Sequence, residues 1–261
     1  MTATQRMSPL DFDVAQDDEL PGYDEASAAP AYELGTYNEP LTTYRLRQYD
    51  RKIQMLADYD APAASSYRIT KNSFRVFSKK PEMEVLYTSQ DMQQRNIASL
   101  AFDDYGGFPW RPRAHFDHTA EDGLSTSYNM ESLNFADWTF TVGDRAYAWT
   151  LGLRPVSLIL CEKNSSMAIA RFTYSEKGVL AVRGAEVGEL TIYRDSLTTG
   201  RDGVDKVVCG LVVVLTFLKK MGKNYTNKAD GLERAASLTR EALPPHRGSS
   251  AGHYSMGNWA G

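Results

Sequence analysis

The segment His115-Phe-Asp117-His118 brings three side chains that can bind a metal within four residues of one another. On a helix, two imidazoles at positions i and i+3 beside a carboxylate can hold a zinc ion. The surrounding sequence, FPWRPRAHFDHTAEDG, is rich in proline and loop-forming residues, and it offers neither a second ligand cluster nor a glutamate base. We therefore expect His115 and His118 to be surface-loop histidines, and we predict no metal site.

No other segment has the pattern of a known catalytic site. The sequence lacks a GxSxG nucleophile elbow, a phosphate-binding Walker loop and an HExxH zinc motif. The segment GAEVGE has two glycines, but no helix is predicted after it, so it does not indicate a dinucleotide fold. We expect a protein that is not an enzyme and that needs no cofactor.

Two tyrosine-ended proline motifs suggest a partner protein. They are LPGYDE, with Leu20, Pro21 and Tyr23, and APAYE, with Pro30 and Tyr32. WW domains bind a polyproline turn of this kind, and two copies nine residues apart would add avidity on a tandem partner. We expect these five residues to recruit a WW-domain protein such as a ubiquitin ligase. The alternative is a linker without a partner.

Six basic residues lie in or near predicted strands and turns, where they suggest a patch for anionic lipid headgroups. The alternative is ordinary solvated charge. The six residues are Arg45, Arg47, Lys79, Lys80, Arg111 and Arg113.

The charges divide the chain into three parts. Residues 1–40 contain nine acids and one base and little apolar surface, so we expect a disordered acidic arm. Residues 226–261 have the composition of a flexible tail, and the body between them, residues 41–225, is mildly basic. This balance excludes a strongly basic nucleic-acid binder and leaves room for attraction to an anionic membrane surface.

The body reads as a series of strands. In TTYRLRQYD, the alternation puts Tyr44, Leu46 and Gln48 on one face. In ADWTFTVGDRAYAWTLG, Gly143–Asp144 predicts a type II′ hairpin turn with Phe140 opposite Tyr147 and Trp138 opposite Trp149. Further hairpins are predicted around residues 164–166 and, between RFTYS and GVLAVRG, at residues 176–177. About ten strands with short turns indicate an all-β barrel or sandwich.

The apolar stretch Val207–Leu218 predicts a buried helix. Twelve residues make about 18 Å of helix, whereas a membrane core is about 30 Å thick, so the stretch is too short to span. Asp202 or Asp205 would cap its start, and Lys219 and Lys220 suit its C-terminal end. Apolar residues on every face predict burial, and we expect these to lie inside one barrel: Val207, Leu211, Val214, Leu215 and Leu218.

The order of these elements resembles a known superfamily. GELTIYRD…DGVDKVVCGLVVVLTFLKKMGKNY is similar to the closing strand, linker and terminal helix of Tubby C-terminal-like proteins, which include LURP-one-related proteins and phospholipid scramblases. The acidic arm with Pro-x-Tyr motifs resembles that of fungal tubby-like proteins. The resemblance implies a closed antiparallel barrel of about twelve strands around a central C-terminal helix, with one or two strands hidden in residues 103–134. It also implies phosphoinositide binding, although no family lipid-binding residue can be matched to a position here.

Together these patterns predict a monomeric tubby-like domain in the cytoplasm, peripheral at the plasma membrane. Two cysteines inside apolar runs, Cys161 and Cys209, fit reduced thiols of an intracellular protein. One alternative is a scramblase-like lipid-transfer or membrane-inserted barrel, although the cysteine-rich stretch of scramblases is lacking. Another is a structural adaptor without lipid affinity.

Overall fold

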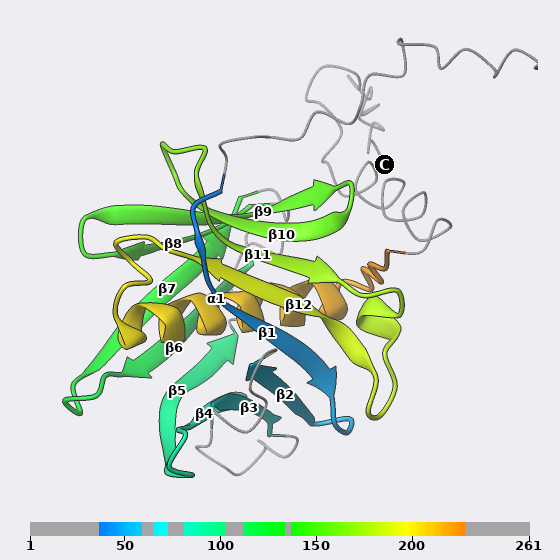
Figure 1. The fold of residues 1–261 in the computed structure, drawn as a ribbon, viewed down its shortest axis with the longest axis horizontal. Helices are drawn as coiled ribbons and strands as arrows, with labels where there is room; N and C mark the ends of the chain where they lie inside the picture. The colour runs from blue at the N-terminus through cyan, green and yellow to red at the C-terminus, as the bar shows by residue number, and fades with distance from the viewer. Residues whose placement is uncertain (1–36, 59–64, 73–80, 103–111, 134–136, 228–261) are drawn as a thin grey trace, which may run out of the picture. The chain divides into compact units, whose positions relative to one another are not determined.

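The protein is described here by a computed structural model, which covers residues 37–58, 65–72, 81–102, 112–133 and 137–227. Twelve antiparallel strands close into a barrel, and one helix, α1, runs through it (Figure 1). Consecutive strands pair with each other, and β1 pairs with β12 to complete the cylinder, so the sheet has no open edge. The strands are β1 (Pro40–Gln48), β2 (Ile53–Asp58), β3 (Ser66–Lys71), β4 (Met83–Thr88), β5 (Gln94–Phe102), β6 (Arg113–Thr119), β7 (Ser125–Ser132), β8 (Trp138–Val142), β9 (Arg145–Leu153), β10 (Val156–Glu162), β11 (Ala168–Tyr174) and β12 (Glu186–Tyr193).

The barrel confirms the fold class and two of the predicted local patterns. Tyr44, Leu46 and Gln48 of β1 all point into the core, with exposed fractions of 8% or less. In the hairpin of β8 and β9, Phe140 pairs with Tyr147 and Trp138 pairs with Trp149. Gly143 adopts a φ of 63°, the positive value that the first central residue of a type II′ turn requires. The segment 103–134 supplies two strands, β6 and β7.

Two strand predictions were wrong. GVLAVRG does not pair with RFTYS; its first residues form a short 3₁₀ helix, η1 (Gly178–Leu180), and β11 pairs instead with β12. Gly178 has a φ of 47° and packs on the backbone of Tyr225, so the chain turns there and cannot continue as a strand. The strand IQMLAD, β2, was missed because its side chains do not alternate clearly between apolar and polar.

Helix α1 (Arg201–Lys220) is longer than predicted: twenty residues, or about 30 Å. Gly200 is its N-cap, without a side-chain cap bond, so neither Asp202 nor Asp205 caps the helix. The helix is longer than the apolar stretch because its first turns also contain polar residues, including the buried Asp205. Among the described residues, no helix has the length and apolarity that crossing a membrane requires.

The central part of α1 is buried as expected. Val207, Leu211, Val214 and Leu218 are each 4% exposed or less, and Leu215 is only partly buried, packed against the same core. Val212, Val213 and Val214 are poor helix formers, so packing inside the barrel stabilises this helix rather than intrinsic propensity.

The antiparallel order defines two ends of the barrel. One end, which we call the Lys220 end, lies at the right in Figure 1. It contains the β1–β2 turn, the β11–β12 connection and the last turn of α1. The turns β4–β5 and β6–β7 and the first turn of α1 lie at the opposite end, which we call the Arg201 end.

Candidate functional site

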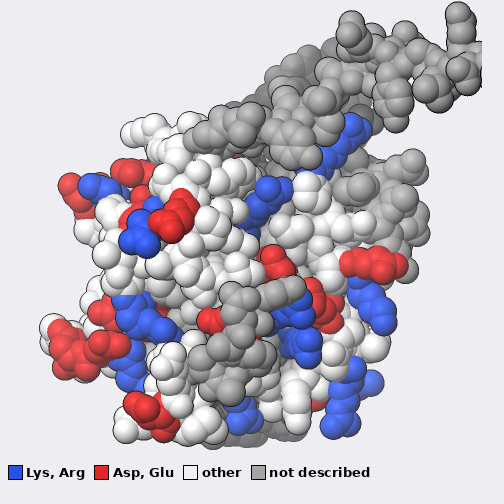
Figure 2. All heavy atoms as spheres, in the orientation of Figure 1, with Lys and Arg blue, Asp and Glu red and all other residues white. Residues whose placement is uncertain are grey.

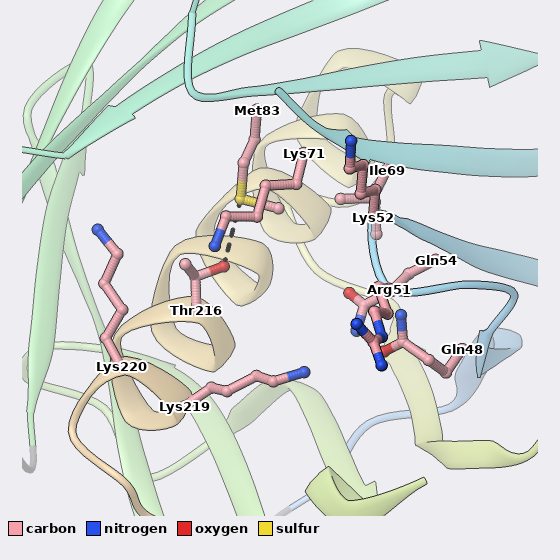
Figure 3. A pocket seen from close by; sticks show the side chains of 10 residues that line it. All are labelled: Gln48, Arg51, Lys52, Gln54, Ile69, Lys71, Met83, Thr216, Lys219 and Lys220. Atoms are coloured by element: carbon pink, nitrogen blue, oxygen red, sulfur yellow. Dashed lines mark hydrogen bonds between the residues drawn. The ribbon is translucent and has the colours of Figure 1, made fainter. Parts of the chain in front are cut away.

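A pocket of about 300 Å³ opens at the Lys220 end, between the β1–β2 turn, strands β3 and β4, and the last turns of α1 (Figure 3). Half of its lining side chains are cationic, and none of the described residues that line it is acidic. The lining residues are Gln48, Arg51, Lys52, Gln54, Ile69, Lys71, Met83, Thr216, Lys219 and Lys220. We call this the basic pocket.

Three of the cations reach into the basic pocket from three different elements. Lys219 extends from α1 toward the side where Arg51 and Gln48 lie, and Lys71 extends from β3 toward Thr216 (Figure 3). By contrast, Lys220 projects to the other side of the helix, and the amine of Lys52 points away from Lys219 (Figure 3). Among the described residues, none of Arg51, Lys71 and Lys219 forms an ion pair. These three charges therefore have no counter-ion in contact among the described residues, which favours an anion in the pocket.

The β1–β2 turn holds Arg51 in place. The carboxylate of Asp50 accepts hydrogen bonds from the backbone N–H groups of Lys52, at 2.6 Å, and Ile53, at 2.8 Å. The side chain of Gln48 accepts a bond of 2.9 Å from Gln54 and itself donates to the backbone oxygen of Asp50. An aspartate that bonds to the backbone two residues later is a common way to fix a tight turn.

The end of α1 would normally oppose an anion, because the helix dipole is negative there. Here the last carbonyls have partners: Lys223 N–H donates to Leu218 at 2.9 Å, and Gly222 N–H donates to Lys219 at 3.0 Å. This is a Schellman motif, in which Gly222 adopts a φ of 72°. With these carbonyls occupied and Lys219 beside them, the helix end is compatible with a bound anion.

Lys220 has a structural role. Its amine lies 3.6 Å from the mostly buried carboxylate of Glu82 and 4.4 Å from the centre of the Phe102 ring. Glu82 in turn accepts a hydrogen bond of 3.2 Å from the backbone of Phe102. Lys220 therefore anchors α1 to β5, and Lys219 is the helix cation that extends toward Arg51 (Figure 3).

A second polar cluster lies at the Arg201 end around Asp205, a fully buried acid of α1. The Asp205 carboxylate accepts a hydrogen bond of 2.8 Å from Tyr67 of β3. The guanidinium groups of Arg201 and Arg95 lie 3.4 Å and 3.5 Å from its oxygens. Burial, and then the negative charge of Asp205, raise the pKa of Tyr67 well above its usual value, so this hydroxyl stays a donor.

The structure corrects the prediction for the histidines. His115 and His118 lie on strand β6, and His118 is buried inside the barrel, with Nε2 3.6 Å from Asp205. The prolines that suggested a loop precede the strand, whose alternation places His118 with the inward residues Ala114 and Phe116. Because of the prolines that precede it, the sequence did not indicate that His118 is buried.

His118, Asp202 and Asp205 have the spacing of metal ligands, since His118 Nε2 lies 3.9 Å from the Asp202 carboxylate and 3.6 Å from that of Asp205. A divalent ion would, however, bind Asp205 against two guanidinium groups already within 3.5 Å of its oxygens. Like-charge repulsion at that distance disfavours a cation. The cluster is better described as two ion pairs, with Arg95 and Arg201, and a hydrogen bond from Tyr67, and His118 lies beside Asp205; together they connect α1 to β3, β5 and β6.

The structure does not bring the predicted lipid-binding residues together. Lys79, Lys80 and Arg111 lie outside the described residues. Arg45 and Arg47 project from β1, where Arg45 lies 3.9 Å from Glu186, whereas Arg113 projects from β6 and lies 3.9 Å from Glu131. Four strands, β2 to β5, lie between β1 and β6 on the shorter path around the barrel, so Arg45 and Arg113 are on different parts of its wall. On the face seen in Figure 2, positive and negative side chains are interspersed.

Sequence reasoning named none of the cations that line the basic pocket as binding residues. Lys219 was interpreted only as a favourable charge at the end of the helix. The sequence does contain two adjacent cation pairs, Arg51–Lys52 and Lys219–Lys220. The two pairs meet in one pocket only because α1 packs inside the barrel. The proposed partner-binding residues Leu20, Pro21, Tyr23, Pro30 and Tyr32 lie outside the described residues.

The chain was also compared with known proteins. No protein-family model matches it, and neither the curated proteins nor the solved structures contain a significant match. The tubby-like membership suggested by the sequence stays a prediction.

Proposed function

We propose that the protein is a non-enzymatic, tubby-like barrel of the cytoplasm that binds a phosphorylated anionic headgroup, of the phosphoinositide class, at a membrane surface. The observation that carries this proposal is the convergence of Arg51, Lys71 and Lys219 in the basic pocket without an acidic partner among the described residues. Phosphate groups accept several charge-assisted hydrogen bonds, and arginine and lysine are the side chains that supply them.

The volume and chemistry of the pocket agree with such a ligand. At about 300 Å³, the pocket lies at the lower end of the range for small-molecule sites. Met83 and Ile69 form an apolar floor, and Gln48 and Gln54 add polar groups to one wall. A phosphorylated sugar ring has the same combination of charged edges and a less polar face.

A titration with a soluble headgroup, inositol 1,4,5-trisphosphate, and with phosphatidylcholine vesicles containing a phosphoinositide tests the proposal. The triple variant Arg51→Gln/Lys71→Gln/Lys219→Gln should lose both interactions. A matched variant, Arg45→Gln/Arg47→Gln/Arg113→Gln, removes the same charge from the outer wall and should bind like the wild type.

Each other outcome contradicts the proposal in a different way. Loss of binding only in the outer-wall variant would move the site to the patch predicted from the sequence. Wild-type protein that binds neither probe would favour the structural adaptor without lipid affinity. Protein that resists extraction from membranes by carbonate would favour the membrane-inserted, scramblase-like alternative.

We also propose that the acidic arm recruits a WW-domain protein, because it contains two tyrosine-ended proline motifs. A peptide of residues 17–36 should bind a tandem WW domain, and Tyr23→Ala with Tyr32→Ala should abolish the binding. Equal affinity of the two peptides would contradict this second function.

A further inference from the structure

Exposed apolar side chains concentrate at the Lys220 end of the barrel. Five of the eight large hydrophobic residues that are exposed in the described part of the chain lie in connections at this end. They are Tyr49 (58% exposed), Leu133 (67%), Leu153 (36%), Leu180 (57%) and Val182 (68%). Single exposed apolar residues are normal on protein surfaces, so the shared end, rather than the exposure itself, is the informative feature.

Backbone hydrogen bonds hold two of these connections side by side. Gly184 N–H donates to the Gln48 carbonyl at 2.6 Å, and Gln48 N–H donates to the Ala185 carbonyl at 3.0 Å. These bonds hold the β11–β12 connection, with Leu180 and Val182, beside the β1–β2 turn. The backbone of the connection that carries both apolar side chains is therefore fixed at this end.

Cations accompany the apolar side chains. Arg51 and Lys52 follow Tyr49, and Lys177 and Arg183 flank η1; all four are exposed, and none forms an ion pair with another described residue. The described acids at this end have partners, and these acids include Glu176 beside Lys177, and Asp137 before β8. Asp50 bonds to its own turn, Glu82 pairs with Lys220, and Glu186 lies 3.9 Å from Arg45.

Apolar tips on separate turns with cations between them match an anionic bilayer better than a protein partner. A protein interface of stable size requires a contiguous, well-packed apolar core, whereas these side chains project from separate connections. Lipid headgroups fill the space between separate tips, and the negative surface potential of a cytoplasmic leaflet attracts the cations. Tyrosine is itself enriched at the level of the headgroups.

We propose that the barrel docks end-on on an anionic bilayer, with Tyr49, Leu180 and Val182 entering the interface and Lys52, Lys177 and Arg183 contacting headgroups. This deepens the proposed function and rests on its membrane part. Gln48, Gln54 and Lys219 line the basic pocket and also a smaller cavity that contains Val179 of η1, so the pocket and the apolar tips belong to the same end. End-on docking places the pocket at the level of the headgroups.

Sedimentation with phosphatidylcholine vesicles containing phosphatidylserine tests the docking surface in the full-length chain. The variant Leu180→Asp/Val182→Asp should reduce vesicle binding by about tenfold or more, because two apolar side chains no longer leave water and two negative charges are added. The matched control Met92→Asp/Leu124→Asp alters two residues at the Arg201 end that are at least as exposed (74% and 68%), and it should bind like the wild type.

Two readouts separate this inference from the proposed function. The Leu180→Asp/Val182→Asp variant should still bind soluble inositol trisphosphate, since it leaves the basic pocket intact. In a Cys161→Ala background, an environment-sensitive dye on Val182→Cys should shift to shorter wavelength with vesicles, and the same dye on Leu124→Cys should not.

Four results would contradict end-on docking. Equal vesicle binding by both double variants, or a dye shift only at position 124, would overturn end-on docking and leave headgroup binding standing. Vesicle binding lost equally in both variants would show a charge effect without an oriented surface. Wild-type protein that binds soluble headgroup but no vesicles would also overturn the docking inference.

Discussion

The buried carboxylate of Asp205, at the Arg201 end of the barrel, accepts a 2.8 Å hydrogen bond from the hydroxyl of Tyr67. Two further strands contribute to the same group, because Arg95 of β5 and His118 of β6 lie 3.5 Å and 3.6 Å from Oδ2. A single acid of α1 is thus connected to three strands of the barrel. This network aligns the helix within the cylinder, whereas apolar packing alone would tolerate some sliding.

Replacing Asp205 with asparagine should destabilise the protein by about 3 kcal/mol. The change leaves two guanidinium groups beside a neutral amide, and their partial exposure, 27% and 29%, keeps the cost at the lower end for a broken buried pair. Urea unfolding followed by circular dichroism measures it. Asp202→Asn is the control, since Asp202 is 38% exposed and its replacement should cost less than about 1 kcal/mol. Equal losses in the two variants would contradict the central position of Asp205.

Alkaline pH should weaken the fold through Tyr67. Burial, followed by the charge of Asp205, raises the pKa of Tyr67 well above the usual 10.0, so the folded state keeps a proton that the unfolded state releases. The stabilisation is complete below pH 10 and is lost as the pH rises toward the folded-state pKa, at about 1.4 kcal/mol per pH unit. Tyr67→Phe should flatten this decline between pH 10 and 11 in urea titrations. Parallel curves for the two proteins would show that Tyr67 does not titrate as described.

Much of the barrel could be predicted from the sequence, because inward and outward residues alternate in most strands. The register of β8 and β9 followed from the Gly143–Asp144 turn alone. The two polar sites could not be predicted, since each gathers residues from distant segments. Asp205 is separated from Tyr67 by 138 residues, and only closure of the barrel makes them neighbours. In the basic pocket, local pairing of β2 with β3 brings Arg51 near Lys71, but Lys219 joins them only because α1 packs inside the barrel.

Gly203→Ala should destabilise the barrel by about 2 kcal/mol or more. An alanine Cβ at this position would overlap the backbone carbonyl of Leu197, which belongs to the connection between β12 and α1. Backbone cannot move aside as a flexible side chain can, so the better helix propensity of alanine does not compensate. Thermal unfolding measures the effect, and Gly200→Ala, where a Cβ meets nothing within 4 Å, is the control. Similar melting temperatures for the two variants would contradict the close approach at Leu197.

Val212→Asp should prevent folding of the barrel. Val212 is 3% exposed at the middle of α1 and belongs to the hydrophobic core cluster, so an aspartate there would be buried among apolar side chains. Burying an unpaired charge costs several kcal/mol, which approaches the whole stability of an ordinary domain, about 5–15 kcal/mol. Lys219→Asp introduces the same side chain at an exposed position of the same helix and should remain folded. Soluble yield and near-ultraviolet circular dichroism distinguish the two variants. A folded, soluble Val212→Asp protein would mean that α1 does not fill the barrel. The basic pocket would then be wrong as well, because it lies between α1 and the strands.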